Sequence, residues 1–212
     1  VVYGILGFKT HTKIALIVRR EKGRLRNYFH IGTGNYNSNT SRYYTDIGLL
    51  STNPTIASDL IELFNFLSGF SKQKIYQKLL VSPLSLRKKF VFLINREIEN
   101  ATKGRKGELI AKMNSLVDPE IIKLLYLASQ KGVEINLIIR GVCCLYPQRE
   151  FLSENIKVKS IIGHFLEHSR IFWFYNNGDP EVFIGSADWM RRNLDRRIEA
   201  ITPIENSKLK SN

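Results

Sequence analysis

Two pairs of residues in the sequence have the types and the spacing for chemistry on an anion. His11 stands two residues before Lys13. His168 stands two residues before Arg170. An apolar run follows each pair and predicts a β-strand, in which residues two apart share a face. A neutral imidazole can act as a nucleophile or proton carrier, and the cation can bind the group it attacks. The pairs therefore indicate group transfer on a phosphoryl-like anion.

A small glycine turn follows each pair, and an acidic residue follows each turn. The turns are Gly-Thr-Gly-Asn at 32–35 and Gly-Ser-Ala-Asp at 185–188. Asp46 and Glu199 each lie fourteen residues after the first glycine of their turn. Glycine allows close approach, so the backbone N–H groups and the short hydroxyl of such a turn could contact an anion. Two half-sites facing each other would place two imidazoles and two cations around one phosphoryl group.

The residues around His168 also fit another pattern. His164, Glu167 and His168 form His-x-x-Glu-His, which on a helix is an inverted zinc-protease signature. The residues after His168 are β-branched or aromatic and favour a strand. We therefore assign His168 to the repeat, interpret His164 as a solvated or locally hydrogen-bonded side chain, and expect no metal ligands in the chain. The role of His30, just before the first turn, is left open.

Composition indicates a globular protein with a polyanionic partner. The 212 residues are 43% hydrophobic and 24% charged, and 32 Lys and Arg against 19 Asp and Glu give a formal charge of +13. The excess is spread along the chain, because residues 1–80 carry 11 basic and 4 acidic side chains and residues 81–212 carry 21 and 15. Nucleic acid, a phosphate polymer or an anionic membrane surface would suit this charge.

Other features of the sequence indicate where such a chain works. The cysteines, Cys143 and Cys144, are adjacent, which disfavours a disulfide between them and indicates a reducing compartment. No apolar run reaches the roughly 18 residues of a membrane span. The sequence starts at Val1 in what resembles the interior of a domain, so we expect a fragment of a longer protein.

Hydrophobic periodicity divides the chain into two α/β domains. In the first, a strand is predicted from Phe8 to Val18, a turn around Gly23, and a second strand after it. Asn53 and Pro54 predict the cap and first turn of a helix. The pattern breaks near residues 71–80. We therefore place one domain at residues 1–80 and another at residues 81–212.

The second domain alternates between helices and strands. Ser82-Pro83 and Asp118-Pro119 predict the starts of two helices, the first ending near Lys103-Gly104 and the second at Gly132. Runs rich in β-branched residues predict strands at Glu108–Met113, Val133–Ile139, Ile156–Ile162, His168–Tyr175 and Glu181–Ile184. The expected fold class is α/β, with mixed sheets flanked by helices and a mostly parallel sheet in the second domain.

The doubled pattern resembles the phospholipase D superfamily, in which one histidine attacks phosphorus and the other serves as acid and base. An aspartate of the superfamily pattern, six residues after the cation, is replaced by Arg19 and Asn176, which disfavours an ordinary phosphodiesterase. Longer strings resemble the C-terminal domains of the bacterial polyphosphate kinase family, from Val1 to about Ile204. They include GFKTHTKIALIVRRE, YFHIGTGNYNSNTSRYYTDIGLL, NLIIRGVCCLYP, FLEHSRIFWF and GSADWMRRNLDRRIEAITPI.

The resemblance implies two phospholipase D-like domains, the first truncated, and an activity. The family transfers the γ-phosphate of ATP reversibly to inorganic polyphosphate through a phosphohistidine. His11 matches the phosphorylated histidine and His168 the second catalytic one, while Tyr44 and Arg140 match nucleotide-contacting positions. With the cations and turn of the repeat, the expected ATP and phosphate site comprises Lys13, Asn35, Tyr44, Arg140, His168 and Arg170.

The resemblance also implies a cofactor and partners. Mg²⁺ accompanies ATP, and its family ligands lie upstream of Val1. We expect ATP and polyphosphate as substrates, a homo-oligomeric full-length enzyme, no specific nucleic acid, and a cytoplasmic location, with peripheral membrane association left open. Two alternatives remain: a phospholipase D-like phosphodiesterase or nuclease acting on a polyanion, and a polyanion-binding module whose chemistry has decayed. The isolated fragment could be inactive.

Overall fold

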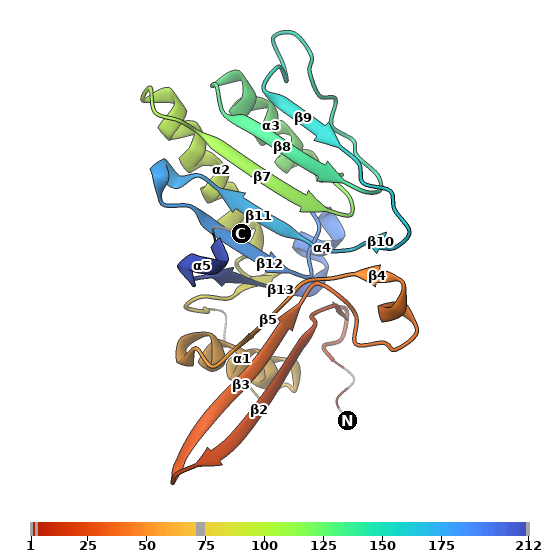
Figure 1. The fold of residues 1–212 in the computed structure, drawn as a ribbon, viewed down its shortest axis with the longest axis vertical. Helices are drawn as coiled ribbons and strands as arrows, with labels where there is room; N and C mark the ends of the chain where they lie inside the picture. Colours follow the sequence, from red (N-terminus) through yellow and green to blue (C-terminus); the bar gives the residue numbers. More distant parts are fainter. Residues whose placement is uncertain (1, 3, 71–74, 211–212) are drawn as a thin grey trace.

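Two three-stranded antiparallel units form the frame of the structure (Figure 1). We call them the N-terminal repeat (residues 9–51) and the C-terminal repeat (residues 166–204). In each, the first strand pairs with the second and the second with the third. The structure is a computed structural model that describes residues 2, 4–70 and 75–210. The strands are β2 (Ile14–Glu21), β3 (Arg24–Gly32) and β5 (Gly48–Ser51) in the N-terminal repeat, and β11 (Ile171–Phe174), β12 (Glu181–Gly185) and β13 (Arg197–Ile204) in the C-terminal repeat.

The C-terminal repeat is part of an eight-stranded mixed sheet in the order β1-β13-β12-β11-β7-β8-β9, with β6 also paired to β13. The α/β class with mixed sheets flanked by helices is confirmed. The expectation of a mostly parallel sheet is wrong, because β11, β12 and β13 are joined antiparallel and β11 is antiparallel to β7. The added strands are β1 (Lys9–Thr10), β6 (Leu80–Ser82), β7 (Glu108–Met113), β8 (Glu134–Ile139) and β9 (Ile156–Lys159); β4 (Tyr44–Thr45) and β10 (Leu166–Glu167) form a separate parallel pair.

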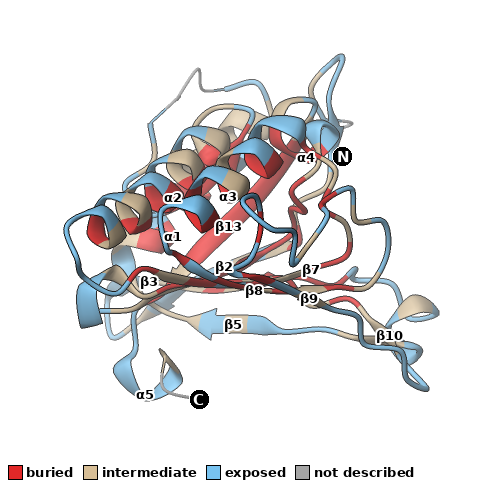
Figure 2. Ribbon diagram, turned by 90° about the horizontal axis from the view of Figure 1, so that it is seen from above, coloured by how far each residue is buried: buried red, intermediate tan, exposed pale blue. Residues whose placement is uncertain are grey.

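Three helices cover one face of the sheets (Figure 2). They are α1 (Pro54–Leu67), α2 (Leu86–Thr102) and α3 (Pro119–Gln130); the shorter α4 (Arg191–Asp195) and α5 (Ser207–Lys210) and two 3-10 turns, Thr40–Arg42 and Asn176–Gly178, complete the described elements. The predicted caps of α1 and α3 are confirmed: the Asn53 side chain accepts from two backbone N–H groups and that of Asp118 from one. None of the described helices is long and apolar enough to cross a membrane.

The helix predicted to start at Ser82-Pro83 starts later. Residues 80–82 are strand β6, which pairs antiparallel with β13. Pairing keeps the chain extended through Ser82, the Ser82–Pro83 peptide is cis, and the helix follows with Ser85 as its N-cap. The sequence signal of serine followed by proline is thus local, whereas the pairing with β13 is a long-range contact.

Two hydrophobic cores meet at β6 and β13. The larger core packs α2 and α3 on the main sheet and includes Phe90, Phe172 and Trp189, whose rings lie within 5.5 Å of one another between centroids. The smaller core packs α1 against β3, and Val81 and Ile198 belong to it. Strands β6 and β13 therefore connect the two cores. The predicted division at residue 80 stays a prediction, and residues 71–74 of the predicted boundary lie outside the described residues.

Asp59 attaches the segment before β6 to α1. It is buried, and its carboxylate accepts backbone N–H bonds from Gln77 (2.9 Å), Lys78 (2.6 Å) and Leu79 (2.9 Å). Such bonds satisfy three backbone donors and a buried charge together. Asp59 therefore fixes where the chain enters β6, and through β6 the position of β13.

We predict that Asp59→Asn destabilises the fold by about 1–3 kcal/mol, because an amide group would face N–H donors that lose their acceptor. Urea unfolding of the two proteins measures the difference. Ser58→Ala is the matched control, since Ser58 is an exposed neighbour on the same helix and should change stability by no more than about 0.5 kcal/mol. Equal midpoints for wild type and Asp59→Asn would contradict the role of Asp59.

Candidate active site between the two repeats

His11 is held by a carboxylate of the C-terminal repeat. Strand β1 runs parallel to the start of β13, and the backbone N–H of His11 donates to the carbonyl of Ile198 at 2.8 Å. This register puts His11 beside Glu199, and its Nδ1 lies 2.9 Å from Oε2. Glu199 is fully buried, and it also accepts from the Ser186 hydroxyl and from the Asn193 amide at 2.6 Å.

His168 is held in the same way by the N-terminal repeat. Strand β10 runs parallel to β4, and the His168 backbone N–H donates to the carbonyl of Thr45 at 3.0 Å. His168 Nδ1 lies 2.9 Å from Oδ1 of Asp46, which also accepts from the Thr33 hydroxyl at 3.4 Å. Each repeat thus supplies the carboxylate that orients the other repeat's histidine.

The contact between His11 Nδ1 and Glu199 decides which ring nitrogen of His11 can react. An ionised carboxylate only accepts hydrogen bonds, so in the neutral ring Nδ1 carries the proton and Nε2 keeps the lone pair. Nε2 of His11 makes no hydrogen bond within residues 4–70 and 75–210. The His11 side chain is a fifth exposed, so this nitrogen is accessible to a reactant. The arrangement is that of a nucleophile oriented by a second group.

Lys13 lies beside His11 and is nearly buried, at 5% exposure. Its Nζ donates to the backbone carbonyl of His11 at 2.6 Å. Burial lowers the pKa of Lys13 to about 8; nearby Arg170 and Arg197 lower it further, while Glu199 and Asp188 oppose the shift. Lys13 is therefore close to half protonated at about pH 8. A bound anion would favour the charged form of Lys13.

Arg170 is the equivalent cation beside His168. Its Nη1 lies 3.3 Å from both ring nitrogens of His168, and it donates to the carbonyl of Thr33 at 3.0 Å. Burial and then the charge of Arg170 lower the pKa of His168, against the effect of Asp46. His168 is therefore neutral at pH 7 and can accept a proton.

Two of the other predicted site residues, Tyr44 and Arg140, lie on the His168 side. The Tyr44 ring stacks at a tilt on His168, with centroids 4.9 Å apart. Arg140 donates twice to Oδ1 of Asn114, at 2.9 and 3.1 Å, and lines a cavity of about 350 Å³ together with Tyr43 and residues 161–167. Asn35 is exposed, and its side chain has no hydrogen-bond partner within the described part of the chain.

Two expectations about local geometry are wrong. The histidine-cation pairs do not lie in strands: residues 11–13 precede β2, and residues 168–170 precede β11. The glycine turns do not present Thr33 and Ser186 to an anion. Their hydroxyls bind Asp46 and Glu199, and their backbone N–H groups donate within the sheets, because the turns end paired strands.

The remaining histidines lie outside this constellation. His30 Nδ1 is 2.6 Å from the Tyr36 hydroxyl, and the His30 ring occupies the space where Gly32 and Gly48 lack a Cβ. His164 makes an edge contact with Phe165. The helix that a zinc signature needs is absent at residues 164–168, where β10 is a strand and His168 binds Asp46.

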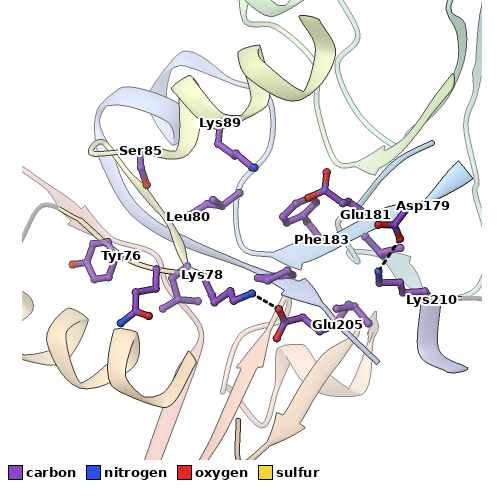
Figure 3. Close-up of a pocket in the computed structure, with 15 residues that line it drawn as sticks. Tyr76, Lys78, Leu80, Ser85, Lys89, Asp179, Glu181, Phe183, Glu205 and Lys210 are labelled. Atoms are coloured by element: carbon purple, nitrogen blue, oxygen red, sulfur yellow. Dashed lines mark hydrogen bonds and ion pairs between the residues drawn. The ribbon is translucent and has the colours of Figure 1, made fainter. Parts of the chain in front are cut away.

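A cavity of about 630 Å³ lies between β12, β13 and the start of α2 and is lined by none of the histidines (Figure 3). Lys78 is paired there with Glu205 at 2.6 Å, and Lys210 with Asp179 at 4.0 Å. The lining holds as many carboxylates as lysines, with Asp179, Glu181 and Glu205 against Lys78, Lys89 and Lys210, so it attracts an anion weakly. Its size therefore does not make this cavity a better candidate for phosphate chemistry than the space between the repeats.

Sequence reasoning missed the residues that hold the site together. It noted Asp46 and Glu199 as repeated acids but gave them no role, and it did not identify Asn114 or Asn193. The equal spacing from each glycine was the available signal for the two acids. Nothing in the sequence marks Asn114 or Asn193. The partner of Asn114 is Asp188, 74 residues further along the chain, and the contact of Asn193 with Glu199 depends on the fold of α4.

We predict that Gly34→Ala lowers the pKa of His168 further. A Cβ on Gly34 would lie 1.9 Å from Oδ2 of Asp46, so the carboxylate must move from His168 and its pKa-raising effect is lost. NMR titration of the imidazole measures the shift. Gly163→Ala is the control, because its Cβ would meet no atom within 4 Å. An unchanged His168 titration in Gly34→Ala would contradict the proposed contact.

We predict that anion affinity falls as pH rises through about 8, the pKa of Lys13. The ammonium is charged below this pH and neutral above it. Titration calorimetry with tripolyphosphate from pH 6.5 to 9.5 measures how the affinity falls with pH. Lys13→Met should bind weakly without this step, and Lys123→Met, a change on the exposed surface of α3, should keep it. The same fall in affinity near pH 8 in Lys13→Met would show that a group other than Lys13 causes the pH dependence.

Comparison with known proteins shows the family of the chain. The family description "Polyphosphate kinase C-terminal domain 2" matches residues 79–212, and "Polyphosphate kinase C-terminal domain 1" matches residues 1–73. Polyphosphate kinase of Parasynechococcus marenigrum strain WH8102 is 66% identical over 99% of this chain and 30% of its own length. That of Prochlorococcus marinus strain MIT 9313 is 69% identical over 97% of this chain and 29% of its own length.

A solved structure agrees as well. The crystal structure of polyphosphate kinase from Porphyromonas gingivalis superposes with a TM-score of 0.93 at 42% identity, over 99% of this chain and 33% of that one. The chain thus spans about three tenths of the length of the curated relatives it matches. It belongs to the polyphosphate kinase family.

Proposed function

We propose that the full-length protein is a polyphosphate kinase that transfers the γ-phosphate of ATP reversibly to inorganic polyphosphate through a phosphohistidine at His11. The observation that carries the proposal is the hydrogen bond between His11 Nδ1 and buried Glu199, which leaves Nε2 as the nucleophile. The names of the relatives support the substrates.

In the first step, Nε2 of His11 attacks the γ-phosphorus of ATP. The bond between phosphorus and the β,γ-bridging oxygen breaks, and ADP leaves with that oxygen. The ring becomes a phosphoimidazolium while Nδ1 keeps its proton, and the carboxylate of Glu199 stabilises the positive ring. Protonated Lys13 neutralises charge on the transferring phosphoryl oxygens.

In the second step, a terminal oxygen of polyphosphate attacks the phosphorus and the bond to His11 breaks. When the attacking terminal phosphate carries a proton, neutral His168 can accept that proton. In the reverse direction His168 returns the proton to the phosphate. Tyr44 and Arg140 are proposed to bind the nucleotide on this side, Tyr44 through its ring and hydroxyl and Arg140 through phosphate oxygens. Because the second step mirrors the first, the same site serves both directions.

Mg²⁺ is proposed to enter with ATP. No group of three or more His, Cys, Asp or Glu side chains is placed to hold a metal ion among residues 4–70 and 75–210. We propose that its protein contacts come from parts of the full-length protein outside this chain, and no step above depends on them. We further propose that the full-length enzyme is a cytoplasmic homo-oligomer.

We predict that the full-length protein labelled with ATP carrying radioactive γ-phosphate forms an acid-labile, base-stable phosphoenzyme that maps to His11. His11→Gln should abolish both the label and polyphosphate synthesis, because the glutamine amide is not nucleophilic. Lys123→Gln, a change on the exposed surface of α3, should retain both. Polyphosphate synthesis at the wild-type rate by His11→Gln would refute the mechanism, and cleavage of a phosphodiester without labelling would favour a phosphodiesterase.

A further inference from the structure

The two half-sites differ in charge although their backbones repeat. The cation is Lys13 in one and Arg170 in the other. The residue three positions after the first glycine of the turn is Asn35 in one and Asp188 in the other. The first half-site therefore has a cation and an amide where the second has a cation and a carboxylate.

In the second half-site the cation is neutralised by the protein. Arg170 Nε donates to Oδ1 of Asp188 at 3.1 Å and Nη2 to Oδ2 at 3.4 Å, and the side chains are only 4% and 6% exposed. The backbone N–H of Asn114 also donates to Asp188, at 2.8 Å, which fixes the carboxylate in place. Nη1 of Arg170 donates to the carbonyls of Thr33 and His168. Every nitrogen of the guanidinium thus has a protein partner.

In the first half-site the cation forms no direct ion pair within the part of the chain that the structure describes, and Glu199 and Asp188 act on Lys13 from beyond ion-pair distance. Lys13 donates to the carbonyl of His11, and an ammonium has two further N–H donors. No carboxylate lies within ion-pair distance of Lys13 among the described residues. Asn35, the counterpart of Asp188, is exposed and contributes no charge. An anion entering between the repeats therefore gains most by approaching Lys13, on the His11 side.

We propose that Asp188 selects His11 over His168 as the phosphate-carrying histidine, by neutralising Arg170 and leaving Lys13 as the cation that draws the γ-phosphoryl group. This inference rests on the proposed function and adds a positioning residue to it. The bond that forms is still between phosphorus and Nε2 of His11, and the bond to ADP still breaks. Asp188 contacts neither; it acts mainly through its direct ion pair with Arg170.

The test is an exchange of the carboxylate between the half-sites in the full-length protein. Asn35→Asp together with Asp188→Asn keeps the total charge, moves the carboxylate to the turn of the repeat that carries Lys13, and removes the carboxylate partner of Arg170. After labelling with ATP carrying radioactive γ-phosphate, peptide mapping should find most of the label on His168 in the double variant and on His11 in the wild type. A folded double variant that labels only His11, or neither histidine, overturns the proposal.

Asn35→Asp alone covers the case in which the buried change at Asp188 prevents folding. Asn35 is exposed, so this variant should fold, and a carboxylate at the counterpart of Asp188 in the first half-site should reduce His11 labelling roughly tenfold or more. Asn39→Asp is the matched control: it adds the same charge at another exposed position of the loop and should keep the label. Full labelling of Asn35→Asp, or equal losses in both variants, overturns the proposal.

The same experiment separates this inference from the proposed function. A wild-type protein without phosphohistidine defeats the proposed function and the inference with it. A wild-type protein labelled on His11, with a double variant whose label does not move, defeats the inference alone.

Discussion

The exchange of carboxylates between the repeats is the interaction on which the rest of the structure depends. A buried carboxylate is unfavourable unless donors surround it, and Glu199 is fully buried. Ser186 and Asn193 supply two of its donors from the same repeat, and His11 supplies the third from the other. Docking of the repeats is thus part of what makes burial of Glu199 tolerable. The contacts that assemble the site and those that stabilise it are the same.

The near-symmetry of this frame separates positioning from chemistry. Parallel pairing of β1 with β13 and of β4 with β10 gives both histidines the same backbone setting. The proposed phosphoryl transfer, however, gives the two histidines different roles, since one carries the group and the other exchanges a proton. The difference comes from a few side chains: the cations, their neighbours after each turn, and the tyrosine that contacts His168 alone. The charges of Lys13, Arg170 and Asp188 act strongly on their neighbours because these three side chains are buried.

Much of the fold and part of the site follow from local sequence. The caps at Asn53 and Asp118 and the strand Glu108–Met113 depend on nearby residues, and their prediction was confirmed. The start of α2 and the sheet directions depend on which strands meet, which a local pattern does not contain. For the same reason the repeat located Asp46 and Glu199, but their crossing to the opposite histidine depends on two short strand pairings between distant segments.

Both repeats lie on one chain, and this removes a restriction that symmetry would impose. Two identical subunits related by a two-fold axis would present the same residue at both half-sites, so neither could differ in charge from the other. In a duplicated chain a mutation alters one half-site and leaves its counterpart unchanged. One repeat can therefore carry Lys13 where the other carries Arg170, and Asn35 where the other carries Asp188. Covalent linkage of the halves thus allows a nearly symmetric architecture to carry two half-sites that differ in charge.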